Sequence, residues 1–102
     1  MKVKQFYNKN QFIIYGGDAI VTFQSYNSII AKIDKKGTLT FGNDWNYSKT
    51  TLKHLYLFLE DKKMFLCDFI KKELEGLQNT KNKKAFLQKL IDNKKIFITE
   101  LN

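Results

Sequence analysis

Two side chains could act together as a nucleophile and a general base, namely Cys67 and His54. They fall on different predicted helices, however, and no third residue is placed to orient the imidazole ring. Cys67 lies in an apolar helical segment, where a free cysteine usually packs in the core. We therefore interpret Cys67 as a core residue and His54 as a surface or packing residue, and we predict that the chain is not an enzyme.

The carboxylates do not make a better case for catalysis. Asp18, Asp34 and Asp44 sit in or beside predicted turns, where aspartate commonly hydrogen-bonds to the local backbone. Gly16-Gly17 is not followed by the further glycine and the lysine of a phosphate-binding loop. One cysteine and one histidine also leave too few ligands for a zinc site. We therefore expect neither a metal nor a cofactor.

The charge of the chain points to binding partners rather than to a reaction. All eighteen basic residues are lysine, and the net charge is +8. Lysine suits phosphate backbones and acidic protein surfaces, whereas bidentate reading of guanine is largely a property of arginine. Sequence-specific recognition of bases is therefore disfavoured. Abundant lysine, asparagine and isoleucine also fit an AT-rich coding genome, in which case the charge needs no functional explanation.

The length and composition predict one folded domain. The chain has 102 residues, of which 43% are hydrophobic and 15% aromatic, so residues 1–102 can bury a core. No apolar run approaches the roughly 18 residues of a membrane-spanning helix. The first ten residues also lack the apolar segment of a secretion signal. These features predict a cytoplasmic protein without a membrane partner.

The first half of the chain has the alternating pattern of β-strands, and a glycine pair marks the first turn. Gly16-Gly17 is expected to form a two-residue hairpin loop, because both residues adopt positive φ angles easily. This loop would place Ile14 opposite Ala19. The register would then direct the even-numbered residues of the first strand toward the core.

Two further turns are predicted in the same segment. The first covers residues 25–27 with Asn27 in the left-handed conformation, and the second covers residues 35–37 with Gly37 in that conformation. The expected opposite pairs are Phe23 with Ile29, and Ile33 with Leu39. The three turns together predict a core face made of Phe12, Ile14, Ala19, Val21, Phe23, Ile29, Ala31, Ile33, Leu39 and Phe41. The reverse face would be open to solvent and would carry Tyr15 beside Lys32.

A structural pivot is predicted where the strands give way to helices. Ser48 has the position of an N-cap, because apolar residues follow it at helical spacing. Tyr47 and Leu52 then have the spacing of a hydrophobic staple, which fixes the angle at which the chain enters a helix. Trp45 would anchor the preceding turn. We interpret Trp45 and Tyr47 as plugs at the edge of the core, with ligand stacking as the alternative.

Three helices are expected between residues 48 and 94. The broad apolar arc of the first, which includes Leu57 and Phe58, predicts that it lies between the sheet and a neighbouring helix. The second would cover residues 63–77 and end near Gly76, and Thr80 would cap the third. Lysines at positions 81, 84 and 95 would then lie along the outer stripe of the third helix, opposite its apolar residues.

The whole pattern predicts an α+β fold. An antiparallel four-stranded meander over residues 11–42 would be covered on one face by about three helices at residues 48–94. A short C-terminal strand is expected at residues 96–101, with the sheet edge as one position for it. Residues 3–7 would either extend the first strand or add a short edge.

Two stretches resemble a known group of sequences. Ser25–Asp34 (SYNSIIAKID) and Trp45–Leu59 (WNYSKTTLKHLYLFL) are similar to a pattern in small uncharacterised proteins of phages and mobile elements from low-GC bacteria. In that family a Ser-Tyr-Asn-Thr turn enters a strand, and Trp-x-Tyr-Ser-x-Thr-Thr-x-Lys/Arg-His-Leu opens a helix. Ser28 stands in place of the threonine. The matching helix positions are Trp45, Tyr47, Ser48, Thr50, Thr51, Lys53, His54 and Leu55.

The resemblance implies a phage-type accessory protein in a bacterial host cell, without a catalytic role for the matching positions. Our leading hypothesis is an anti-CRISPR-like protein that binds and inhibits a host protein or a protein–nucleic acid complex. The alternative is a nucleic-acid binder that uses lysines, with aromatic rings that stack on bases. The candidate partner-binding residues are Tyr15, Lys32, Lys81, Lys84 and Lys95, and the structural pivot comprises Trp45, Tyr47, Ser48 and Leu52.

Overall fold

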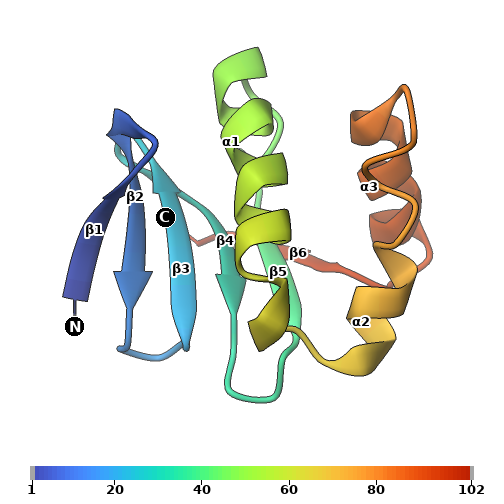
Figure 1. Cartoon of the computed structure of the whole chain (residues 1–102), viewed down its shortest axis with the longest axis horizontal. Coiled ribbons are helices and arrows are strands. Elements are labelled where there is room, and N and C mark those ends of the chain that lie inside the picture. Colours follow the sequence, from blue (N-terminus) through green and yellow to red (C-terminus); the bar gives the residue numbers. More distant parts are fainter. Residues whose placement is uncertain (1, 102) are drawn as a thin grey trace.

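A computed structural model describes residues 2–101, except for the side chain of residue 8. Figure 1 shows a twisted sheet with the helices on one side of it. The elements in chain order are β1 (Lys2–Phe6), β2 (Asn8–Tyr15), β3 (Val21–Ser25), β4 (Ser28–Ile33), β5 (Leu39–Gly42), α1 (Lys49–Asp61), the short 3-10 helix η1 (Lys63–Phe65), α2 (Asp68–Glu73), α3 (Lys83–Asp92) and β6 (Phe97–Thr99).

The α+β prediction is confirmed, and the sheet has six strands, because the terminal segments add β1 and β6 to the four strands of the predicted meander. Their spatial order is β1-β2-β3-β4-β5-β6. The first five strands form an antiparallel meander, whereas β6 runs parallel to β5 after the chain has passed through the helices. The two terminal segments therefore form the two edges. Within residues 2–101, no helix is both long and apolar enough to cross a membrane.

The register between β2 and β3 differs from the expected one. Gly16 and Gly17 do have positive φ angles, but the loop spans residues 16–20 instead of two residues. Tyr15 therefore pairs with Val21, and Ile13 pairs with Phe23. The register of β2 against β3 therefore differs from the predicted one by an odd number of residues, and this exchanges the two faces of β2. Ile13 accordingly lies in the core, and the even-numbered residues Phe12 and Ile14 do not.

A β-bulge alters the next hairpin. Tyr26 has a φ angle of 54°, so Tyr26, and not Asn27, adopts the left-handed conformation. The register shifts between Phe23 and Gln24, which leaves one extra residue on β4. This extra residue is Ile30, which is fully buried. The prediction had placed Ile29 in the core instead, but Ile29 is only half-buried.

The turn between β4 and β5 agrees with the prediction and joins the sheet to the helices. Ile33 pairs with Leu39, and Gly37 has a φ angle of 83°. The carbonyl of Gly37 accepts a hydrogen bond of 3.1 Å from the backbone N–H of Cys67. A Cβ atom at position 37 would lie only 2.4 Å from that nitrogen. The turn therefore requires glycine for both its conformation and its close contact.

The N-cap prediction for α1 is confirmed. The Ser48 hydroxyl oxygen accepts a hydrogen bond of 3.1 Å from the N–H of Thr51. Trp45 is 2% exposed and packs against Phe41, with 5.3 Å between ring centroids. Tyr47 is 52% exposed, however, so it does not act as a plug at the core edge. Leu52 is half-buried and packs against the core.

The predicted second helix is divided into η1 and α2. Leu66 and Cys67 have extended backbone angles, because the N–H of Cys67 is directed to the β4–β5 turn. The α2 helix ends at Glu73, with Leu74 and not Gly76 as its C-cap. Asn82 caps α3 by accepting a 3.0 Å hydrogen bond from the N–H of residue 85, so the Thr80 cap is also wrong.

Candidate functional site

The predicted pairing of Tyr15 with Lys32 on the open face of the sheet is wrong. Tyr15 lies on the helix-covered face, where the Lys62 Nζ atom is 5.2 Å from its ring centroid. Lys32 lies on the other face, and its Nζ atom is 3.1 Å from a carboxylate oxygen of Asp18. The hydrogen bond from Lys32, and then its charge, hold the pKa of Asp18 below its usual value. Tyr15 and Lys32 therefore do not form a platform on which bases can stack.

Tyr15 is also engaged at the C-terminal end of α1. Burial alone would lower the pKa of Lys62, but its interactions with Tyr15 and Asp61 outweigh that effect and raise the pKa. The ammonium nitrogen of Lys62 lies 3.0 Å from a carboxylate oxygen of Asp61. The tyrosine ring thus belongs to a local contact with the helix end and is not a free binding surface.

The three lysines expected along the third helix do not share one helical stripe. Lys84 lies in α3, but Lys81 precedes the N-cap and Lys95 follows the end of the helix. The helix ends at Asp92, and the left-handed Lys94 then redirects the chain. The Lys95 Nζ atom lies 4.8 Å from the ring centroid of Phe69 in α2. The expected basic row is therefore broken at both ends.

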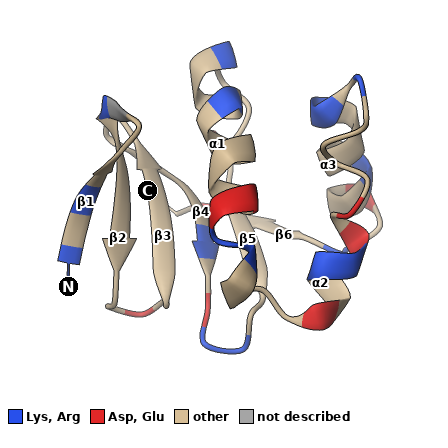
Figure 2. Ribbon diagram, viewed as in Figure 1, with Lys and Arg blue, Asp and Glu red and all other residues tan. Residues whose placement is uncertain are grey.

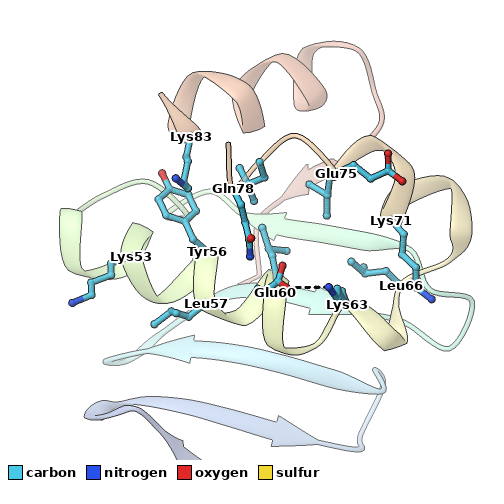
Figure 3. A pocket seen from close by; sticks show the side chains of 13 residues that line it. Lys53, Tyr56, Leu57, Glu60, Lys63, Leu66, Lys71, Glu75, Gln78 and Lys83 are labelled. Atoms are coloured by element: carbon cyan, nitrogen blue, oxygen red, sulfur yellow. Dashed lines mark hydrogen bonds and ion pairs between the residues drawn. The ribbon is translucent and has the colours of Figure 1, made fainter. Parts of the chain in front are cut away.

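A hollow on the helical side lies between α1 and the segment that runs from η1 to the start of α3 (Figure 3). Its volume is about 650 Å³, which lies within the range of roughly 300–1,000 Å³ that is usual for ligand pockets. We call this hollow the α1 groove. Its lining residues are Lys53, Tyr56, Leu57, Leu59, Glu60, Lys63, Leu66, Lys71, Leu74, Glu75, Leu77, Gln78 and Lys83.

The floor of the α1 groove is apolar and is continuous with the core. Leu59, Leu66 and Leu77 are between 2% and 6% exposed, so packing from below fixes their positions. Tyr56 is half-buried at one end, and burial raises the pKa of its hydroxyl group. A floor held by core contacts is preformed, which lowers the entropic cost of binding.

Four lysines and two glutamates form the rim. The Lys63 ammonium group lies 3.0 Å from Glu60, and the Lys71 ammonium group lies 4.0 Å from Asp68. Lys53 and Lys83 form no ion pair with any residue between positions 2 and 101, although the Lys83 Nζ donates a 3.4 Å hydrogen bond to a backbone carbonyl. The rim therefore has a net positive charge that its own carboxylates do not neutralise.

The chemistry of the groove favours binding. Among the described residues, its lining contains no cysteine or histidine. His54 is buried elsewhere in α1, where its Nδ1 lies 2.9 Å from the carbonyl oxygen of Thr50. Cys67 is half-buried beside the β4–β5 turn. Across residues 2–101, no group of three or more potential ligands among His, Cys, Asp and Glu is gathered to hold a metal ion.

Sequence reasoning did not identify the groove, although one signal pointed toward it. The broad apolar arc of α1 predicted contacts with a neighbouring helix as well as with the sheet. Tyr56 and Leu57 lie on the side of that arc that lines the groove. Lys83 comes from a segment thirty residues beyond Lys53, so only the fold brings the two lysines to one rim.

Comparison with known proteins gives a match to a family model. No curated protein and no solved structure matches the chain. A family model, described as a family of unknown function (DUF8033), matches residues 1–76. The match includes every element from β1 to α2 and ends before α3, so it covers one wall of the α1 groove and part of the other. Because the family model matches most of the length of the chain, the chain belongs to the DUF8033 family.

Proposed function

We propose that this protein is a non-catalytic accessory protein, of the phage or mobile-element type, that binds and inhibits a protein of its host. The observation that carries the binding proposal is the α1 groove, with its apolar floor and lysine rim. The accessory origin and the anti-CRISPR-like inhibitory role are supported by the sequence resemblance of residues 25–34 and 45–59.

The groove has the features that distinguish the energetic centre of a protein interface. Such centres combine buried apolar contacts with an aromatic anchor, and a polar rim excludes water from them. Tyr56 supplies an aromatic ring with a polar end, and three buried leucines form the floor. The lysines around them provide electrostatic steering of an acidic partner.

Lysine-mediated binding of nucleic acid is the competing proposal. The position of Tyr15 removes the stacking platform that motivated it. Figure 2 shows lysines on strands, turns and helices alike. A binder that tracks a phosphate backbone instead concentrates its positive charge along one groove or face. The net charge of +8 still favours contact with phosphate groups, so this alternative has to be tested.

Two charge-matched variants separate the proposals. Lys53→Glu/Lys83→Glu reverses the groove rim, whereas Lys81→Glu/Lys84→Glu makes the same charge change outside the groove lining. The protein and both variants are immobilised on a support, and each is incubated with a lysate of the native host, with and without nuclease. We expect the parent protein to capture a host protein whose recovered amount is not changed by nuclease. That amount should fall at least tenfold with the rim variant and should be unchanged with the control variant.

Nucleic-acid binding would give the opposite pattern. Captured material would disappear with nuclease, and the two variants would lose binding equally because they lose the same charge. The parent would also bind random duplex DNA, with a logarithmic salt slope of about −0.9 for each phosphate contacted. That result would overturn the proposed function.

A further inference from the structure

We infer that the occupant of the α1 groove is an amphipathic α-helix of the partner protein, with acidic side chains beside its apolar stripe. This inference rests on the proposed function and adds the secondary structure and the charge of the bound segment. Three features of the groove support it: the nature of its walls, its length and the distribution of charge on its rim.

The walls of the groove favour a helix over an extended segment. An added β-strand needs a row of free backbone N–H and C=O groups at a sheet edge. The edges of this sheet are β1 and β6, and neither contributes a residue to the groove. The lining comes from α1, η1, α2, the first residue of α3 and the segments that connect them. A segment in this groove must therefore bind through its side chains, as an amphipathic helix does.

The length of the groove fits about two turns of helix. Lys53 and Glu60 both line it and are seven residues apart in α1. At 1.5 Å per residue they are separated by about 10 Å along the helix axis. A helix lying alongside would place apolar anchors at positions i, i+3 or i+4, and i+7 over that distance. Tyr56 lies between the two ends, where it can contact the middle anchor.

The charge on the rim selects an acidic helix. Figure 3 shows Lys53, Tyr56 and Lys83 at one end of the groove, and Lys71 at the other. Lys63 neutralises Glu60 at a distance of 3.0 Å. The remaining positive charge would repel lysines on the occupant and attract glutamates or aspartates, since like charges opposed at an interface are strongly unfavourable. Acidic residues beside the apolar stripe would match the end that carries Lys53 and Lys83, because Lys71 at the other end already lies 4.0 Å from Asp68.

Synthetic peptides test this assignment with the folded protein of residues 1–102. The first peptide has leucines at positions i, i+3, i+4 and i+7 flanked by glutamates. The second carries lysines in place of the glutamates, and the third is a scrambled form of the first. We expect calorimetry at low salt to show at least tenfold tighter binding of the glutamate peptide than of either other peptide. Lys53→Glu/Lys83→Glu should invert the preference between glutamate and lysine peptides, and Lys81→Glu/Lys84→Glu should leave it unchanged.

Several outcomes would overturn the helix assignment. These are no binding of the glutamate peptide, equal binding of its scrambled form, or an equal response of the two protein variants. Binding of dodecanoate that depends on Lys53 and Lys83, without peptide binding, would instead assign the groove to a small amphipathic anion. If the peptides fail but groove-dependent capture of a host protein persists, only the helix assignment is lost. If both fail, the proposed function is lost as well.

Discussion

Replacing Trp45 by alanine is expected to lower the free energy of unfolding by about 4 kcal/mol, because truncation of a large buried ring removes its packing and leaves a cavity. Trp45 is 2% exposed, and its ring lies 5.3 Å from that of Phe41 between centroids. Its backbone N–H also donates a 3.1 Å hydrogen bond to Gly42 in the turn that leads toward α1. Alanine keeps this backbone bond, so the expected loss reflects the contact of the Trp45 ring with Phe41 of β5 and with the rest of the core.

Tyr47→Ala is the matched control for this measurement. It removes an aromatic ring from the same turn, but the ring is 52% exposed, so a loss below about 1 kcal/mol is expected. Urea unfolding followed by circular dichroism gives both values. If the two variants unfold at the same urea concentration, Trp45 does not anchor the turn.

Gly37→Ala is expected to cost about 3 kcal/mol. The φ angle of 83° is unfavourable for any residue with a Cβ atom, and the added Cβ would lie 2.4 Å from the backbone nitrogen of Cys67. Relief of that overlap must move the β4–β5 turn away from the start of α2, which breaks the 3.1 Å hydrogen bond between them. The cost therefore combines backbone strain with the loss of a contact between sheet and helix.

Gly17→Ala separates the two contributions. Gly17 has a similar φ angle of 79° but is exposed in the β2–β3 loop. Its replacement should cost only the conformational penalty, about 1 kcal/mol. Equal unfolding free energies for the two alanine variants would show that the contact between Gly37 and Cys67 is not important for stability.

The elements that were predicted correctly are those with strong local signals. The N-cap at Ser48 follows from a hydroxyl residue placed before an apolar stripe, and the structure confirms it. The Gly37 turn follows from a residue that tolerates positive φ, and its register is also confirmed. In both cases the determining interactions lie within a few residues along the chain.

The failures share a different cause. The β2–β3 loop is five residues long because Gly16 donates a backbone hydrogen bond to Ile20, and the glycine pair alone did not predict this length. The bulge at Ile30 depends on which side chain fits the core beneath the sheet. The break at Cys67 depends on the carbonyl of Gly37, thirty residues earlier. Local periodicity carries no information about such distant partners.

The same limitation applies to the candidate site. A basic row on one predicted helix was the most that periodicity could suggest, and that helix proved too short to hold it. The α1 groove forms where residues 53–63 of α1 and η1 face residues 66–83. Its existence depends on how the helices are packed, which the spacing of residues within each helix does not determine.

Photo-cross-linking from within the α1 groove tests the central claim most directly. A benzophenone amino acid replaces Gln78, an exposed lining residue, and in a control it replaces Gln5 on the distant edge strand β1. After irradiation in the native host cell, we predict a discrete cross-linked protein from position 78, resistant to nuclease, and no such product from position 5. Equal cross-linking from both positions, or a product from position 78 that nuclease removes, would contradict the assignment of the groove as the protein-binding surface.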